Sequence, residues 1–213
     1  MSNETTAAKT TRNSVETTRM IAFSGMFAAI AAVLMFFEIP LPFAPVFYKL
    51  DFSEVPVLIG TFCFGPVTGA VIEGLKILLK FVIKGTSTAG VGELANFAVG
   101  CAFVVPAGIV YKVMKSRKGA LIGCVTGTLV MIVLGCVINA YVLLPFYANA
   151  FEMPIDALIA MGTAVNPAIN SLLTFVMLAV APFNLLKGVL VSLITFLLYK
   201  RISRLVKGAK NGL

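Results

Sequence analysis

Three polar side chains, Asn139, Asn184 and Lys187, lie inside long apolar runs, where a polar group is costly. Asn184 precedes Lys187 by three residues, so on a helix the two side chains share one face. Amide N–H groups and an ammonium donate hydrogen bonds to carbonyl oxygens and ring nitrogens of a small molecule. Hydrogen bonds between helices, or a snorkelling lysine, would also explain these residues. We treat them as candidate ligand contacts, with helix packing as the alternative.

The segment 38–54 is a second candidate for ligand contact, because it is too aromatic for a simple linker. It contains Phe47, Tyr48 and Leu50 among its apolar residues. Aromatic faces stack on flat rings, so these side chains are expected to line the mouth of a site for a planar ligand. Aromatic residues are also common at a membrane surface, and that alternative stays open.

Further candidates flank two of the apolar runs. Glu93 and Asn96 begin the run 92–114, and Tyr141 follows Asn139 by two residues. We include all three in the candidate ligand-binding set. Glu93 and Asn96 would equally serve to cap or steady a helix end.

Charged residues at helical spacing mark the run 67–84. Glu73, Lys76, Lys80 and Lys84 are three or four residues apart and share one helical face. Such a face is expected to point toward protein or water. Pairing of Lys76 and Lys80 with Glu73, and with Glu93 from another helix, is the favoured interpretation.

Small residues recur every four positions in the first apolar run. Gly25 is followed by Ala29, and Ala28 by Ala32. Small side chains on one face let another helix approach closely. We expect either a docking face for another subunit or packing within this chain.

The elements that must position these residues are membrane helices. Apolar residues make up 59% of 213, about 126, and only 12% are charged. A soluble domain is about 45–50% apolar and about 25% charged. At roughly 20 apolar residues per membrane helix, the chain has enough for about six helices with short loops. We therefore predict an all-α membrane protein with six transmembrane helices.

Charge and turn residues divide the chain further. The predicted spans are about 20–37, 55–72, 67–84, 92–114, 119–146 and 168–200. Gly65-Pro66 interrupts the second, so its helix is expected to end at Phe64 and the next to begin at Pro66 or Val67. Either the last helix begins later than residue 168 or Pro182 breaks it, and residues 164–178 are expected to be partly an outer element.

Basic clusters set the predicted orientation. Positive charge gathers before the first run, at 112–118 and after residue 200, and cytoplasmic loops carry such charge. Both termini are therefore expected to be cytoplasmic. The predicted organisation is a disordered cytoplasmic tail over 1–17, a membrane substrate-binding domain over 18–205 and a basic cytoplasmic tail over 206–213.

Several chemistries are disfavoured by what the sequence lacks. It has no histidine, and its four cysteines show no C-x-x-C spacing, so neither a metal site nor catalytic residues are predicted. It has no phosphate-binding G-x-x-x-x-G-K-[ST] motif and no acidic cluster of the D-D-x-x-D type. The net charge of +8 is explained by the basic loops and not by nucleic acid. We predict a non-enzyme without a cofactor.

Four segments together resemble one family. They are Asp51-Phe-Ser-Glu-Val-Pro56, Phe64-Gly-Pro-Val-Thr-Gly69, Val91-Gly-Glu-Leu-Ala-Asn-Phe97 and Pro182-Phe-Asn-Leu-Leu-Lys187. In combination and order they are similar to the riboflavin-specific substrate-binding (S) components of energy-coupling factor (ECF) transporters. The resemblance covers about residues 20–205.

The resemblance implies a function and partners. It implies a subunit in the bacterial cell membrane, in contact with lipid, that captures riboflavin from outside, with flavin mononucleotide (FMN) as a further candidate ligand. Asn139, Asn184 and Lys187 match the positions that hydrogen-bond the ring system. The small residues of the first helix, Ala28 and Ala32, match a motif that docks a transmembrane coupling subunit. Two cytosolic ATPases would supply the energy. The alternatives are an S component for another vitamin and a stand-alone small-molecule transporter.

Overall fold

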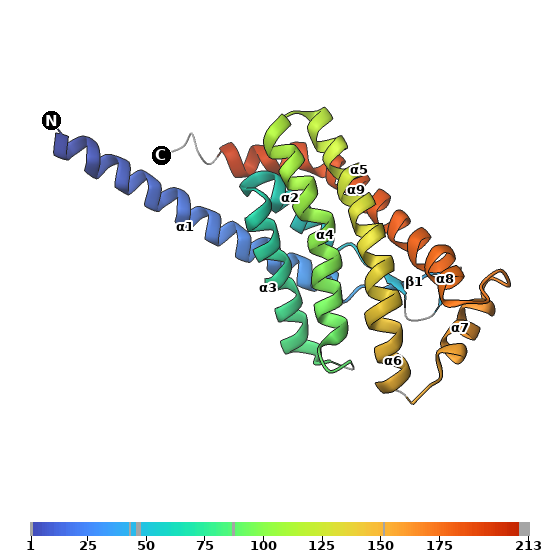
Figure 1. The fold of residues 1–213 in the computed structure, drawn as a ribbon. Coiled ribbons are helices and arrows are strands. Elements are labelled where there is room, and N and C mark those ends of the chain that lie inside the picture. Colours follow the sequence, from blue (N-terminus) through green and yellow to red (C-terminus); the bar gives the residue numbers. More distant parts are fainter. Residues whose placement is uncertain (1, 43, 46–47, 87, 151, 209–213) are drawn as a thin grey trace.

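The computed structural model describes residues 2–42, 44–45, 48–86, 88–150 and 152–208, which form a helical bundle with one short hairpin (Figure 1). The elements, in chain order, are α1 (Ser2–Leu34), β1 (Ile39–Pro40), β2 (Lys49–Leu50), α2 (Glu54–Phe64), α3 (Pro66–Lys84), α4 (Val91–Met114), α5 (Arg117–Ile138), the π-helical turn η1 (Asn139–Leu143), α6 (Leu144–Ala150), α7 (Ile155–Thr163), α8 (Leu172–Phe175), the π-helical turn η2 (Val176–Val180) and α9 (Ala181–Gly208).

Four helical segments of the described chain are long and apolar enough to cross a membrane. They are Val15–Leu34, Val91–Met114, Arg117–Ala150 and Leu172–Tyr199. The predicted helical membrane protein is thus confirmed in its class. Helix α2 has only 11 residues and α3 carries four charged side chains, so neither is among the four. The count of six spans stays a prediction.

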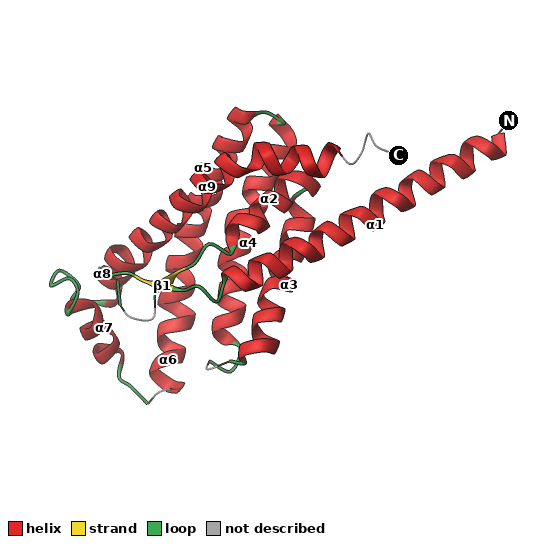
Figure 2. Ribbon diagram, turned by 180° about the vertical axis from the view of Figure 1, so that it is seen from behind, coloured by secondary structure: helices red, strands yellow, loops and turns green. Residues whose placement is uncertain are grey.

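Helix α1 is longer than its predicted span of 20–37. It begins at Ser2 and continues without interruption to Leu34, so most of the tail 1–17 that was expected to be disordered is helical here. The sequence between Ser2 and Ser24 has no glycine or proline to break a helix. Figure 2 shows α1 projecting well beyond the rest of the bundle. Of the predicted C-terminal tail, residues 206–208 end α9, and 209–213 lie outside the described residues.

The turn at Gly65-Pro66 divides α2 from α3 as the sequence predicts. Gly65 has a φ of 103°, a conformation that glycine adopts without steric cost. Pro66 is the first residue of α3, where its missing N–H has no helical partner to lose. The turn sends α3 back along α2, and the two helices pack together.

The last long helix begins later than the predicted start at 168. Ser171 and Thr174 cap its first turn reciprocally, and α8, η2 and α9 then follow one another directly. Pro182 does not break this helix. The π-turn η2 ends at Val180, two residues before Pro182. Pro182 has no backbone N–H, so it donates no hydrogen bond to the preceding turn of the helix. The expected outer element is instead the separate helix α7.

Two apolar clusters hold the bundle together. The larger contains Val57, Ile72, Phe103, Met131 and Val191, one from each of five helices, and all five are buried. The smaller lies between α6, α7, α8 and η2, and includes Leu144, Leu158, Phe175 and Val180. The hairpin β1–β2 pairs Ile39 with Leu50, and the chain after it carries Asp51 to the bundle.

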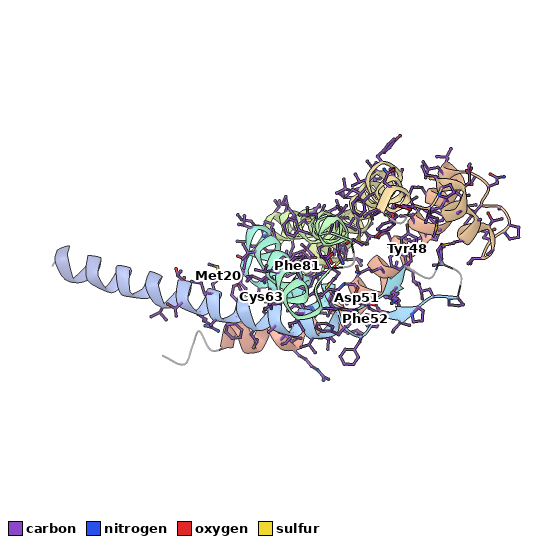
Figure 3. All side chains as sticks on the ribbon, turned by 90° about the horizontal axis from the view of Figure 1, so that it is seen from below. Met20, Tyr48, Asp51, Phe52, Cys63 and Phe81 are labelled. Atoms are coloured by element: carbon purple, nitrogen blue, oxygen red, sulfur yellow. The ribbon has the colours of Figure 1, made fainter. Side chains whose placement is uncertain are left out.

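Both ends of the described chain lie at one end of the molecule. In Figures 1 and 2, α1 begins and α9 ends toward the same end as the turn between α4 and α5. The loop between α3 and α4, and α7, lie at the other end. Viewed from that other end, Tyr48 and Asp51 lie within the bundle outline and Met20 lies far along α1 (Figure 3).

Candidate ligand-binding site

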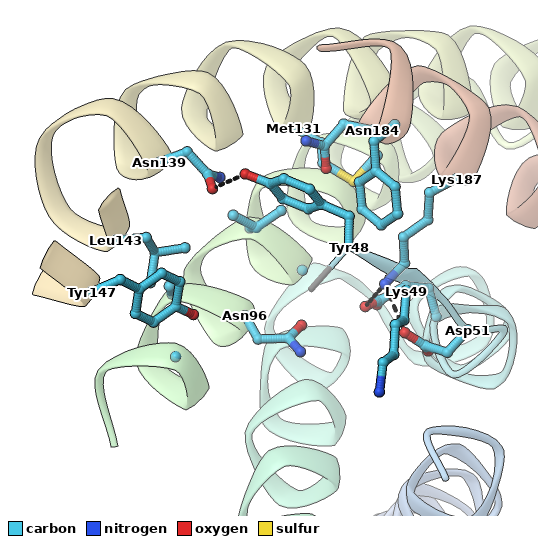
Figure 4. A pocket seen from close by; sticks show the side chains of 16 residues that line it. Tyr48, Lys49, Asp51, Asn96, Met131, Asn139, Leu143, Tyr147, Asn184 and Lys187 are labelled. Atoms are coloured by element: carbon cyan, nitrogen blue, oxygen red, sulfur yellow. Dashed lines mark hydrogen bonds and ion pairs between the residues drawn. The ribbon is translucent and has the colours of Figure 1, made fainter. Parts of the chain in front are cut away.

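A polar cavity of about 180 Å³ opens inside the bundle, beneath the strand β2 (Figure 4). Five of the sequence-predicted residues line it, from four separate parts of the chain. The lining side chains that the argument uses are Tyr48, Asn96, Asn139, Asn184 and Lys187, together with Asp51, Glu54 and Met131. The structure therefore brings together residues that are up to 139 positions apart in the sequence, from Tyr48 to Lys187.

The two amides sit beside the two π-helical turns. Asn139 is the first residue of η1, and its Nδ2 donates to the Gly135 carbonyl at 2.8 Å. Asn184 follows η2 by four residues, and its Nδ2 donates to the Val180 carbonyl at 2.9 Å. The turns η1 and η2 contact each other, so both amides reach the cavity. Such π-turns are frequent at functional sites.

A glycine makes room for one of these amides. A Cβ at Gly135 would lie 2.9 Å from Nδ2 of Asn184, a distance that real Cβ atoms do not tolerate. The amide of Asn184 therefore packs directly on the backbone of α5.

Lys187 lies in the cavity wall between two acids. Its Nζ is 3.2 Å from Oδ2 of Asp51 and 3.6 Å from Oε1 of Glu54. Burial by itself raises the pKa of the Asp51 carboxyl, but the charges of Lys187 and Lys76 and the hydrogen bonds from Ser53 outweigh it. The pKa of Asp51 therefore lies well below its usual range. Sequence reasoning placed Asp51 and Glu54 only in an outer loop and missed them as partners of Lys187.

The same acids connect Lys187 to a fully buried ion pair on α3. Nζ of Lys76 is 2.9 Å from Oε1 of Glu54 and 2.7 Å from Oε1 of Glu73. The approach to Glu73 lies outside hydrogen-bonding angles, so neither oxygen of Glu73 has a directional hydrogen bond. Pairing of Lys76 with Glu73 was predicted from their spacing. The prediction for Lys80 was wrong, because it pairs with Glu38 at 3.7 Å. Glu93, the further predicted partner of both lysines, instead accepts hydrogen bonds from threonines.

Tyr48 closes one side of the cavity. Its hydroxyl donates to Oδ1 of Asn139 at 2.5 Å. Its ring lies 5.3 Å from that of Phe183 and 6.3 Å from that of Phe175, both tilted against it. The side chain thus combines an aromatic face with a polar tip directed at the first amide (Figure 4).

Three other predicted residues within the described part of the chain, Leu50, Tyr141 and Glu93, do not line this cavity. Leu50 is buried beside it in β2, and Tyr141 is 78% exposed on η1. Residues two positions apart do not share a helical face, so Asn139 points into the cavity while Tyr141 points away from it. Phe47 lies outside the described residues.

A second cavity of about 500 Å³ continues the first and shares Lys49, Asp51 and Asn96 with it. Glu93 lines this outer cavity and accepts hydrogen bonds from the hydroxyls of Thr86 and Thr88, at 2.9 and 3.0 Å. The predicted Glu93 and Asn96 therefore belong to the outer part and to the junction.

Three lysines surround one carboxylate at this outer cavity. Glu38 lies 3.1 Å from Lys49, 3.7 Å from Lys80 and 3.8 Å from Lys84. Partial burial by itself raises the pKa of the Glu38 carboxyl. The hydrogen bond from Lys49 and the three ammonium charges lower it by more, so the pKa of Glu38 lies below its usual value. The formal charge of the group is +2, from three ammonium groups and one carboxylate.

The small residues of α1 face in two directions. Ala28 and Ala32 are 1% and 3% exposed and pack against this chain's own helices. Gly25 and Ala29 are exposed, and a Cβ at Gly25 would meet nothing within 4 Å. Of the predicted docking face, only Gly25 and Ala29 are thus open to another subunit in this structure.

The chain matches the model of one protein family over residues 19–199, described as the substrate-specific component of ECF transporters. It is 36% identical over 195 residues to the riboflavin transporter RibU of Staphylococcus aureus (strain TCH60), covering 92% of this chain and 95% of that protein. It is 32% identical over 189 residues to the riboflavin transporter FmnP of Bacillus subtilis (strain 168), covering 88% and 93%.

A solved structure supports the same assignment. The chain is similar to the protein described in "Structure and mechanism of the S component of a bacterial ECF transporter", with a TM-score of 0.71 and 33% identity. The match covers 90% of this chain and 99% of the solved one. This protein, a transport component and not an enzyme, belongs to the family of substrate-specific components of ECF transporters.

Proposed function

We propose that this chain is the riboflavin-binding subunit of an ECF transporter in the bacterial cell membrane. It captures the vitamin from outside and delivers it to the cytoplasm together with a transmembrane coupling subunit and two ATPases. The observation that carries the proposal is the pair of amides Asn139 and Asn184 beside Lys187 in one buried cavity. The names of the relatives, with 32–36% identity over about nine-tenths of the chain, support riboflavin as the ligand.

The chemistry of the cavity suits a flavin ring. An isoalloxazine carries carbonyl oxygens and ring nitrogens along one edge, and the amide N–H groups and the ammonium of Lys187 donate to such atoms. The ring of Tyr48 offers an aromatic face for stacking. The outer cavity then receives the hydroxylated side chain of riboflavin, where Asn96 and Glu93 are the polar contacts.

The proposed orientation has six spans with both termini in the cytoplasm. It is supported by the location of the chain ends and of the basic turn between α4 and α5 at one end of the molecule. The described acids outside the buried cluster, apart from Glu4 and Glu16 on α1, lie toward the other end, in the loops and on α4 and α7. Cytoplasmic loops are those that carry the excess of Lys and Arg.

The direct test is a titration of the detergent-purified protein with riboflavin, followed by flavin fluorescence. Quenching at stoichiometric riboflavin is expected, with no competition from thiamine, biotin or folate. Absence of quenching, together with colourless protein after expression in rich medium, would contradict the assignment. Competition by another vitamin would favour the alternative of an S component for that vitamin.

Asn184→Ala is expected to weaken riboflavin binding about tenfold, because one buried ligand partner is left without its hydrogen bond. The matched control is Asn149→Ala, which removes an exposed amide on α6 that lines neither cavity. Equal affinity of the two variants would show that Asn184 serves helix packing.

The lysines around Glu38 lead us to include FMN among the proposed ligands. Lys49 and Lys80 line the outer cavity beside Glu38, and with Lys84 this group has a formal charge of +2, which complements a phosphate at the end of the ribityl chain. The carboxylates of Asp51 and Glu93 line other parts of the same cavity. Lys80→Gln is expected to weaken FMN binding about fivefold, at about 1 kcal/mol for a charge-assisted contact, and to leave riboflavin binding unchanged. Lys118→Gln, at the opposite end of the molecule, is the charge-matched control. An equal loss for both flavins would contradict a phosphate contact at Lys80.

A further inference from the structure

A third cavity, of about 410 Å³, lies at the other end of the bundle from the ligand-binding site. It opens where α4 ends and α5 begins, and α9 forms its opposite wall. Its inner lining is apolar and aromatic, and its rim is basic. The inner residues are Phe62, Tyr111, Ala120, Cys124, Phe196, Leu197 and Tyr199, and the rim consists of Lys115, Ser116 and Arg117.

The rim carries positive charge without compensation in the described part of the chain. Lys115 and Arg117 are exposed, and no described carboxylate lies within ion-pair distance of either. Ser116 caps α5 by accepting a hydrogen bond from the N–H of Gly119 at 3.0 Å. The N-terminus of α5 and the C-terminus of α4 meet at this rim, so their dipole ends offset each other and the positive charge comes from Lys115 and Arg117.

Two tyrosines add a hydroxyl donor to the wall of this cavity. The hydroxyl oxygens of Tyr111 and Tyr199 are 2.7 Å apart. The ring of Tyr199 lies edge to face with those of Tyr111 and Phe62, and the ring of Tyr111 is tilted against that of Phe62. One hydroxyl hydrogen is used between the two oxygens. The other hydrogen of the pair is left to donate to an anion that enters from the rim.

The apolar wall continues onto the outer surface of the bundle. Phe196 and Leu197 line the cavity and are also exposed, as are Leu193 and Val113 nearby on α9 and α4. A free inorganic anion makes no favourable contact with such a surface. An acyl chain covers it, and burial of apolar surface stabilises a complex by about 25 cal/mol per Å². The basic rim, the hydroxyl donor and the apolar wall together match a molecule with an anionic head and a hydrocarbon tail.

We propose that this cavity binds an anionic phospholipid, with the phosphate between Lys115 and Arg117 and an acyl chain against Phe196 and Leu197. The inference rests on the orientation proposed above, which places the cavity at the cytoplasmic leaflet. That leaflet carries the anionic lipids, and basic pockets between helices on that side accommodate their headgroups.

The test compares phosphatidylglycerol with phosphatidylcholine on the detergent-purified full chain. Native mass spectrometry is expected to detect one retained phosphatidylglycerol in preference to phosphatidylcholine. Arg117→Gln and Lys115→Gln are each expected to reduce this preference about fivefold, at about 1 kcal/mol per basic residue near the membrane surface. Lys118→Gln removes the same charge from the same helical turn but does not line the cavity, and is expected to retain the preference. Tyr199→Phe is expected to lower it by a smaller factor.

Three outcomes would overturn the proposal. They are an equal loss of preference in Lys118→Gln, no preference in the unchanged protein, and full displacement of the lipid by inorganic phosphate, which would identify a free-anion site. Riboflavin binding, measured in the same samples, is expected to be unchanged in every variant. A failed lipid test therefore leaves the proposed function standing, and a failed flavin titration leaves the lipid result standing.

Discussion

Five buried ionic side chains connect α2, α3 and α9 to the wall of the ligand-binding site. Asp51, Glu54 and Glu73 supply three carboxylates, and Lys76 and Lys187 supply two ammonium groups, so the formal charge of the cluster is −1. Removing one partner of a buried ion pair leaves an uncompensated charge, which costs far more than the pair itself contributes. The effect of a substitution in this cluster on stability should therefore depend on the sign of the charge that it removes.

Lys76→Gln is expected to destabilise the protein by about 3–5 kcal/mol, because it removes one of the two ammonium groups and changes the formal charge of the cluster from −1 to −2. Glu73→Gln, its charge-matched counterpart three residues away, brings the cluster to −2 + 2 = 0 and is expected to change stability little. The measurement is the thermal unfolding midpoint in detergent. A similar loss of stability in both variants would show that side-chain geometry, and not net charge, governs the cluster.

Lys187 has two roles, in the cavity wall and in the ionic cluster. It lines the cavity with Asn139 and Asn184, and it also neutralises Asp51 and Glu54. Truncation of Lys187 alone would combine lost ligand contact with lost ion pairing. The pair Lys187→Ala with Asp51→Asn removes both charges together, so any remaining loss of riboflavin affinity reports on ligand contact.

At the scale of single elements, the small residues of α1 lie on two different faces of the helix. Ala28 and Ala32 lie on the face that packs on α2 and α3, whereas Gly25 and Ala29 face outward. The outward pair has the four-residue spacing that lets a second helix approach closely. We therefore propose the outward face, defined by Gly25 and Ala29, for docking of the coupling subunit.

Gly25→Trp and Ala29→Trp are expected to abolish riboflavin uptake by cells and to leave riboflavin binding unchanged. Ala28→Trp is the matched contrast. Its indole has no space in the interior, and overpacking of this kind costs about 1–3 kcal/mol or more. The protein is expected to lose binding and uptake together. Normal uptake by the Gly25 and Ala29 variants would place the docking surface elsewhere.

At the scale of the whole molecule, one short and largely apolar chain contains binding cavities at its two ends. The ligand-binding site and its outer cavity lie toward the α3–α4 loop, and the proposed lipid site lies toward the chain ends. The sequence carries no nucleotide-binding motif of the G-x-x-x-x-G-K-[ST] type. In the function proposed above, the energy for uptake comes from the two ATPases.

Proteoliposomes that contain this chain alone are expected to bind riboflavin without accumulating it. Addition of the coupling subunit and both ATPases, with ATP, is expected to produce accumulation inside the vesicles, measured by flavin retained after filtration. A non-hydrolysable ATP analogue serves as the control. Accumulation by the chain alone would instead favour the stand-alone transporter.

The amino-acid sequence by itself determined the features that depend on composition and on neighbouring residues. The apolar content indicates membrane helices, Gly65-Pro66 separates α2 from α3, and the isolated polar residues Asn139, Asn184 and Lys187 identify candidate contacts. Four short segments in a fixed order indicated the family, which the comparisons confirmed. These features follow from local backbone preferences and from the cost of polar groups in an apolar run.

Only the tertiary structure decided which distant residues meet. It paired Lys187 with Asp51 and Glu54, brought the hydroxyl of Tyr48 to Asn139, and buried Ala28 while leaving Gly25 outside. None of these follows from local spacing, because an ion pair between residues 136 positions apart, or the direction of a helix face, depends on how whole helices pack. The physical reason is that periodicity specifies a face, but only its neighbours in space determine what that face contacts.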